Sequence, residues 1–178
     1  MMDFRRAASM TAAWVAALGT VAALTTTPSA VAAASCAVND GVYGAAFYGD
    51  EDALLTDESG EAGTPVVLRP PLGEPGYQEW AIDSSGDDTC TIRNVRSGHY
   101  LTPAAAAVRP HQLVLVDTRP FEWQVRISSQ ADRVFISAPL PDGELRLDQA
   151  PLLINPPHVD LQEPRPYGAQ EWQLIWHE

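Results

Sequence analysis

The chain has 178 residues, which is enough for one domain once any targeting segment is set aside. It carries 23 acidic residues against 11 basic ones, for a formal net charge of −12, and all of its basic residues are arginine. An acidic chain without a basic run repels phosphate backbones, so the composition argues against nucleic-acid binding. The same acidity favours solubility and attracts cationic partners.

Residues 1–34 have the pattern of a secretory signal peptide. An arginine pair precedes an apolar run at Thr11–Leu24, and A-x-A cleavage signals follow. We therefore expect a secreted, extracellular chain of residues 35–178 with no membrane partner. Two alternatives stay open. One is a retained anchor, although the run is shorter than the roughly 20 residues that a bilayer needs. The other is lipid attachment at Cys36.

Two cysteines follow the predicted signal peptide, Cys36 and Cys90. An even number of cysteines in an exported protein favours a disulfide bond. Closing a loop of this length could stabilise the fold by about 4 kcal/mol in the chain-entropy model. Two free thiols remain the alternative.

Three similar segments recur along the chain, each with an aromatic residue followed two places later by an apolar one. Trp80, Trp123 and Trp172 mark them, at spacings of 43 and 49 residues. The period of two indicates strands, and recurrence at such a spacing indicates a repeated structural unit. The alternative is three unrelated strands that each carry a tryptophan. The segments are Gln78–Ile82, Phe121–Val125 and Gln170–Leu174.

Short runs with turn signals between them fill the rest of the chain, and its 15 proline and 12 glycine residues interrupt every longer run. The pattern predicts twelve strands in three sets of four, with turns such as Pro139–Gly143 between them. Three such units favour an all-β closed barrel with a hairpin cap and threefold pseudo-symmetry, in which the three tryptophans share the core. The strands before each tryptophan segment are Val42–Tyr48, Ala53–Thr56 and Thr64–Leu68, then Thr89–Val95, His99–Thr102 and Gln112–Val116, then Arg133–Ser137, Leu145–Asp148 and Val159–Gln162.

This organisation resembles a β-trefoil, and the resemblance covers the whole of residues 35–178. In the ricin-type lectins each repeat ends in a Q-x-W strand, and Q-E-W stands here at Gln78–Trp80 and Gln170–Trp172, with Phe121 in the glutamine place of the middle copy. The chain is also similar to the fungal-type trefoil inhibitors of serine proteases, and the order and spacing of four pieces fit that family better. The pieces are LLTD at Leu54–Asp57, GTPVVL at Gly63–Leu68, QEWAI at Gln78–Ile82 and CTIRNVRSGHYLT at Cys90–Thr102.

The inhibitor resemblance implies a rigid loop presented to an extracellular serine protease, with little ordering cost on binding. In the fungal family the loop between the second and third strands can carry this role through a basic residue. The matching segment here, Asp57–Gly63, has no arginine, so its target would have to accept an acidic residue. Other loops with arginine are Arg96–Gly98 and Arg119–Pro120. The candidate contact residues are Asp57, Glu58, Ser59, Gly60 and Glu61, together with Arg96 and Ser97.

The lectin resemblance implies a sugar site that pairs an acidic residue with Asn or Gln and an aromatic platform. Asp50 with Tyr48, or Asp148 with Gln149, could form such a site, although neither pair repeats across the three units. Carbohydrate binding is therefore the second hypothesis, and a purely structural or interaction trefoil is the third.

The sequence has no G-x-S-x-G elbow, no H-E-x-x-H and no paired-cysteine motif. Its four histidines show no metal-ligand spacing. The acidic residues fall mostly in loops or at alternating strand positions, which predicts a solvated face. We therefore expect a monomer that is not an enzyme and has no cofactor or metal.

Overall fold

The computed structural model describes residues 36–86, 88–130, 132–166 and 169–178, without the side chain of residue 51. The predicted signal peptide at residues 1–34 lies outside the described residues, so secretion stays a prediction. All the regular structure in the described part of the chain is β-strand. No helix among these residues is long and apolar enough to cross a membrane.

The strands form three consecutive repeats, which we name repeat 1, repeat 2 and repeat 3. Repeat 1 contains β1 (Gly41–Phe47), β2 (Asp50–Thr56), β3 (Thr64–Pro65), β4 (Val67–Arg69) and β5 (Glu79–Ser84). Repeat 2 contains β6 (Cys90–Asn94), β7 (Tyr100–Pro103), β8 (Gln112–Asp117) and β9 (Gln124–Ile127). Repeat 3 contains β10 (Arg133–Leu140), β11 (Gly143–Gln149), β12 (Val159–Gln162) and β13 (Trp172–His177).

The twelve predicted strands are confirmed with shifted bounds, and one of them is interrupted. The strand predicted at Phe121–Val125 begins only at Gln124, and Trp123 forms an isolated bridge with Cys90. The strand predicted at Thr64–Leu68 is split at Val66 into β3, which pairs with β8, and β4, which pairs with β2. One predicted turn is too long, because Pro139 pairs with Glu144 inside the β10–β11 hairpin and only Pro141 and Asp142 connect the two strands. A proline is tolerated in a strand where its position needs no ladder donor.

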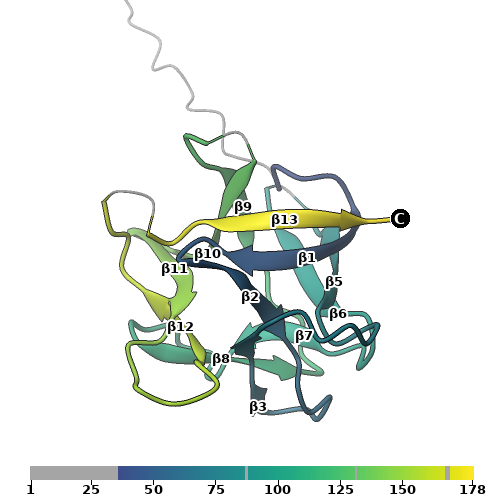
Figure 1. Cartoon of the computed structure of the whole chain (residues 1–178). Helices are drawn as coiled ribbons and strands as arrows, with labels where there is room; N and C mark the ends of the chain where they lie inside the picture. The colour runs from purple at the N-terminus through teal and green to yellow at the C-terminus, as the bar shows by residue number, and fades with distance from the viewer. Residues whose placement is uncertain (1–35, 87, 131, 167–168) are drawn as a thin grey trace, which may run out of the picture. The chain divides into compact units, whose positions relative to one another are not determined.

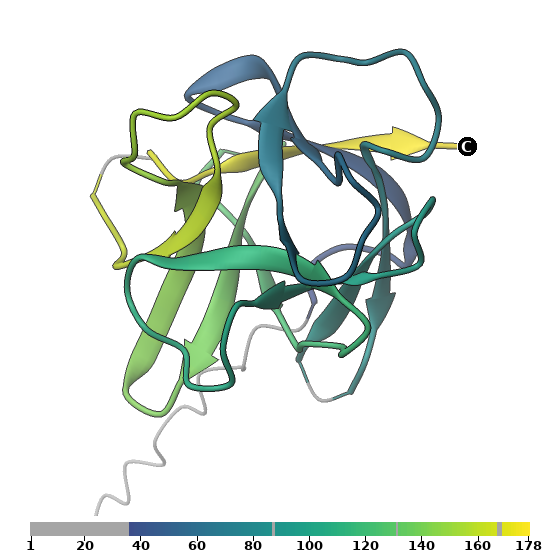
Figure 2. The same cartoon turned by 90° about the horizontal axis from the view of Figure 1, so that it is seen from below.

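The first and last strands of each repeat close the barrel. In Figure 1, β13 runs beside β1, and the two strands pair antiparallel along their full length. β1 also pairs with β5, and β10 likewise pairs with both β9 and β13. The third strands gather at the opposite end of the barrel, which Figure 2 shows from below. There the backbones of Val66, Val114 and Val159 are joined by hydrogen bonds, and all three side chains are fully buried.

The three tryptophans occupy equivalent places in the core, as the sequence predicts. Trp80, Trp123 and Trp172 are at most 1% exposed. Each indole N–H donates to the backbone carbonyl of a buried leucine in the second strand of its own repeat, at 2.9–3.0 Å. A buried indole needs such an acceptor, so the bond fixes its orientation while the ring fills the barrel. The acceptors are Leu55, Leu101 and Leu147.

A disulfide bond joins Cys36 to Cys90, with the two Cα atoms 5.7 Å apart. Cys90 begins β6, is fully buried, and exchanges two backbone hydrogen bonds of 2.8 Å with Trp123. The bond therefore ties the start of the described chain to the core of repeat 2.

The expectation that the acidic residues lie mostly on a solvated face has four exceptions. The structure buries four carboxylates that the alternating pattern places outside or in loops: Asp57, Asp148, Asp160 and Glu171, all at most 2% exposed. Buried carboxylates are costly unless they are hydrogen-bonded or paired, and Asp57, Asp148 and Asp160 each accept hydrogen bonds from defined partners.

Candidate functional site

Asp148 lies at the edge of an open pocket of about 500 Å³ between repeats 1 and 3. One wall is the β1–β2 turn, at Phe47–Gly49. The other wall is the end of β11 and the residues that follow it. The remaining lining residues come from β12 and from the loop before β13, and they are Gln162, Arg165 and Ala169.

The Asp148 carboxylate is held by three donors. Its Oδ2 accepts from Gln170 Nε2 at 3.0 Å and from an Nη2 of Arg165, and its Oδ1 accepts from the Gln149 backbone N–H at 2.8 Å. Gln170 is itself fully buried and donates to the carbonyl of Glu163 at 3.0 Å. The carboxylate is therefore a fixed anchor beneath the pocket, and Arg165, whose side chain is half exposed, is oriented by it.

The same glutamine arrangement occurs in repeat 1 without the acid. Gln78 Nε2 donates to Thr56 Oγ1 at 3.0 Å and to the carbonyl of Pro70 at 3.0 Å. Thr56 follows Leu55 as Asp148 follows Leu147, so Thr56 and Asp148 are equivalent positions. Repeat 3 differs from repeat 1 in combining the glutamine with a carboxylate.

Polar and aromatic groups complete the pocket. Gln162 donates to the Gln149 carbonyl at 2.8 Å, which fixes the rim. Tyr48 stands on the opposite wall, 36% exposed, with the Arg133 guanidinium over its ring at 3.4 Å. The pocket thus offers the half-exposed Arg165 guanidinium, oriented by the buried Asp148, and a ring face, which are groups that recognise a polar ligand with an apolar face.

The structure assembles this pocket partly from residues that the sequence singled out. Tyr48, Asp148 and Gln149 all line it, although the sequence placed Tyr48 with Asp50 instead. Sequence reasoning missed Gln162, Arg165 and the role of Gln170. The Q-E-W motif contains the signal for Gln170, but the motif by itself indicates only a strand.

The two loops proposed for protease contact lie beside each other. A Cβ placed on Gly60 would stand 3.9 Å from the Ser97 Cβ. Asp57 is buried and accepts from the Gly60 N–H at 2.8 Å, so it braces the loop from inside. Gly60 has a φ of 72°, a left-handed conformation that suits a tight turn rather than an extended segment.

The other predicted contact residues are engaged with their neighbours. Glu58 forms an ion pair with Arg69, and Ser59 Oγ lies 2.7 Å from Thr64 Oγ1. The carbonyl of Glu61 accepts from Thr64 Oγ1. The Arg96–Ser97 turn is held by the Asn94 side chain. Protease contact through these loops stays a prediction.

No group of His, Cys, Asp and Glu that could hold a metal ion occurs among the residues that the structure describes. The chain matches no family model, and no curated protein matches it.

Several solved structures share this fold, with low sequence identity to the chain. The designed threefold-symmetric protein ThreeFoil is 17% identical, over 76% of this chain and 99% of its own, with a TM-score of 0.67. The ricin B-like lectin of Macrolepiota procera, determined with lactose, is 17% identical over 79% and 99%, with a TM-score of 0.66. The Rhizoctonia solani agglutinin is 21% identical over 79% and 97%, with a TM-score of 0.68.

At these identities the likeness establishes the fold, which is a β-trefoil. The resemblance to ricin-type lectins is supported at the level of architecture by these neighbours. The resemblance to the fungal protease inhibitors is not confirmed by them. One further match is to an exo-β-1,3-galactanase of Clostridium thermocellum, of which 31% is covered, and the expectation that this chain is not an enzyme stays a prediction.

Proposed function

We propose that this chain binds carbohydrate at the pocket between the β1–β2 turn and β11. The observation that carries the proposal is the convergence there of the anchored Asp148 carboxylate, the Arg165 guanidinium and the Tyr48 ring. Sugar hydroxyls both donate and accept hydrogen bonds, whereas their ring carbons present an apolar face. The Arg165 guanidinium, held in place by Asp148, donates to the sugar oxygens, and the Tyr48 ring covers the apolar face.

The similar structures agree with this proposal. Several of them are lectins by name, and the Macrolepiota procera lectin was determined with lactose. Lactose is therefore the first sugar to test, followed by an array of glycans for the wider class.

Calorimetry of the full chain with the best glycan of the array tests the site. We expect Tyr48→Ala to weaken binding at least tenfold, because the ring supplies the platform. Asp148→Asn should weaken it comparably, because Arg165 loses its charged partner. Tyr77→Ala is the matched control, since Tyr77 also carries a stacked guanidinium, from Arg96 at 3.7 Å, but lies outside the pocket. A protein that binds no glycan, or Tyr48→Ala binding as tightly as wild type, would refute the proposal.

Serine protease inhibition is the second candidate function, and one exposed loop favours it. The segment between β11 and β12 corresponds in repeat 3 to Asp57–Gly63 in repeat 1. At its tip the side chain of Leu153 is fully exposed, at 105%, between Leu152 and Ile154, which are 55% and 42% exposed. An exposed leucine in a loop fits the apolar specificity pocket of a chymotrypsin- or subtilisin-like enzyme.

Inhibition assays with chymotrypsin, subtilisin, trypsin and a glutamyl-specific protease test this candidate function. If Leu153 enters the specificity pocket, Leu153→Arg should abolish inhibition of chymotrypsin and create inhibition of trypsin. Leu72→Arg adds the same charge on another loop, where the leucine is 43% exposed, and should change neither. Absence of inhibition across the panel would reject this candidate and leave the carbohydrate proposal untouched.

A further inference from the structure

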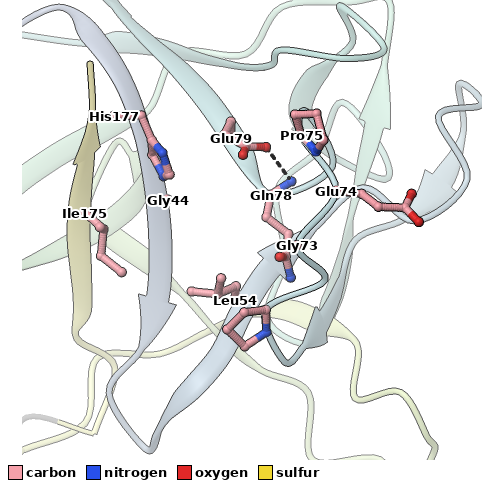
Figure 3. Close-up of a pocket in the computed structure, with 10 residues that line it drawn as sticks. Gly44, Leu54, Gly73, Glu74, Pro75, Gln78, Glu79, Ile175 and His177 are labelled. Atoms are coloured by element: carbon pink, nitrogen blue, oxygen red, sulfur yellow. Dashed lines mark hydrogen bonds between the residues drawn. The ribbon is translucent and has the colours of Figure 1, made fainter.

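A groove of about 310 Å³ runs along repeat 1 (Figure 3), and it shares no lining residue with the Asp148 pocket. Gly44 and Leu54 lie on its floor, Ile175 stands on one side, and Gln78 and Glu79 form the other. The lining residues come from β1, β2, the start of β5, β13 and the loop between β4 and β5. The groove is therefore assembled where the last strand of repeat 3 meets the first strand of repeat 1.

The strand registers identify the equivalent place in repeat 3. Ala46 pairs with Leu54 in repeat 1, as Ser137 pairs with Arg146 in repeat 3, so Leu54 and Arg146 correspond. Gly44 pairs with Glu79 on one side and with Ile175 on the other. Phe135 holds the same position in repeat 3 and pairs with Arg126.

In repeat 3 this place is filled by the chain's own Arg146. Its guanidinium lies 3.8 Å from the Phe135 ring centroid and pairs through Nε with Glu144 Oε1 at 3.0 Å. Burial lowers the pKa of Arg146, and the charge of Glu171 acts against that decrease. Glu171 is 1% exposed and stands directly before Trp172, as Glu79 stands before Trp80. The guanidinium is thus held between an aromatic floor and two acids.

Repeat 1 has the equivalent of Glu171 but lacks the two arginines. Glu79 is retained, while Leu54 takes the place of Arg146 and Ile175 takes the place of Arg126. Gly44 replaces Phe135, and the His177 imidazole takes up part of the space that the ring leaves, with its Nε2 3.2 Å from where a Cβ on Gly44 would stand. Repeat 1 therefore has an open groove with apolar surfaces and a carboxylate, at the position where Arg146 fills the groove in repeat 3.

The Glu79 carboxylate is held by the backbone of its own loop. Its Oε2 accepts from the Gly76 and Gln78 backbone N–H groups, and Figure 3 shows the second of these contacts. No hydrogen bond to Oε1 occurs among the described residues, so this oxygen retains its full capacity to accept. Glu74, also on the groove's rim, points away from the other labelled side chains in Figure 3.

We propose that the repeat 1 groove binds an arginine side chain of a partner protein, with its guanidinium on Glu79 and its methylene stem along Leu54 and Ile175. A guanidinium is planar and weakly hydrated, which suits a half-apolar groove better than an ammonium group. The chain's net charge of −12 attracts such a partner at long range. The site is independent of the carbohydrate proposal.

An NMR titration of the full, isotope-labelled chain with the capped peptide acetyl-Gly-Arg-Gly-amide tests this site. We expect saturable shifts centred on Leu54, Glu79 and Ile175. The citrulline peptide, which is isosteric but neutral, should bind at least tenfold more weakly, and the lysine peptide should fall between the two. Charged hydrogen bonds of this kind account for such ratios.

Three variants define the geometry. Glu79→Gln keeps an oxygen to accept from Gly76 and Gln78, so the loop should fold as before while arginine binding falls at least tenfold. Leu54→Arg should abolish binding by filling the groove from inside, as Arg146 does. Glu74→Gln removes the same charge from a side chain that points away and should change the affinity less than twofold.

Two results would overturn the proposal. One is equal loss of binding in Glu74→Gln and Glu79→Gln, which would show unspecific attraction to an acidic surface. The other is the absence of saturable shifts in the groove at low ionic strength. Neither result would affect glycan binding at the Asp148 pocket, and Leu54→Arg should leave that binding unchanged.

Discussion

Phe121 stands where a glutamine would satisfy the buried hydroxyl of Thr102. In repeats 1 and 3 the corresponding glutamines donate to Thr56 Oγ1 and to Asp148 Oδ2. In repeat 2 the Phe121 ring instead contacts Trp123, with ring centroids 4.9 Å apart. The Thr102 side chain is fully buried, and its Oγ1 has no hydrogen-bond partner among the residues that the structure describes.

Replacing the two equivalent threonines by valine should therefore have opposite effects. Thr102→Val removes an unsatisfied buried hydroxyl and should raise the free energy of unfolding by about 1 kcal/mol. Thr56→Val removes one of the acceptors of Gln78 and should lower the free energy of unfolding by roughly 1–2 kcal/mol. Urea unfolding of both variants beside wild type measures this. Destabilisation by Thr102→Val would show that its hydroxyl is satisfied, for example by buried water.

Replacing each core tryptophan by phenylalanine should lower the free energy of unfolding by about the same amount in all three repeats. Trp80→Phe, Trp123→Phe and Trp172→Phe each remove an indole N–H that donates to a buried carbonyl. Each should lower the free energy of unfolding by roughly 2 kcal/mol. Trp176→Phe, at a site 54% exposed, is the control and should cost under about 0.5 kcal/mol. If one of the three core variants lost no more stability than Trp176→Phe, the three core tryptophans would not be equivalent.

Removing the disulfide bond should destabilise the fold without changing it. Cys36 and Cys90 are 54 positions apart, and opening such a loop costs about 4 kcal/mol in the chain-entropy model. For a domain of this size we expect Tm to fall by roughly 10 °C. Calorimetry of the Cys36→Ser/Cys90→Ala variant measures the change, and a reductant should lower Tm of wild type but not of the variant. Equal melting with and without reductant in wild type would show that the bond contributes nothing.

Asp160 should make the fold less stable as pH rises. Burial raises the pKa of this carboxyl above 3.8, against the opposing effects of Gln162 and His111. Between the unfolded and the folded pKa, the folded protein therefore holds a proton that the unfolded chain has released. The free-energy penalty of burying the charged carboxylate is absent below the unfolded pKa and complete above the folded pKa. Asp160→Asn removes that penalty and can still accept from Gln162.

The measurement is the free energy of unfolding of wild type and Asp160→Asn between pH 3 and pH 7. The advantage of the variant should be smallest at the acid end and grow through the window above pH 3.8. Leu161 replaced by valine, one position along the same strand, gives a cost that should be independent of pH. A constant difference between Asp160→Asn and wild type would contradict the raised pKa.

The sequence was sufficient for the fold because the signals of a trefoil are local and repeated. Alternation identifies each strand, and Trp80, Trp123 and Trp172 set the register of the three units. The split of one strand at Val66 could not be predicted, because it results from pairing with both β2 and β8, which belong to different repeats.

The candidate site was only partly predictable for a similar reason. Asp148 and Gln149 were recognised as a pair of the right kind, but the third component, Tyr48, comes from a turn a hundred residues earlier in the chain. The burial of Asp148 was also missed. Alternation predicts which face of a strand a side chain takes, whereas a loop folded over that face decides whether water reaches it.

The pairing of β1 with β13 has a consequence for how the chain can be rearranged. Since the last strand lies against the first, the ring of strands has no structural beginning, and the backbone could be reopened at another gap between repeats. A circular permutant that links the two present ends and starts between β5 and β6 would keep every core contact, provided that Cys36 still reaches Cys90. The order of the three repeats along the chain would then reflect the protein's evolutionary history and not a requirement of the fold.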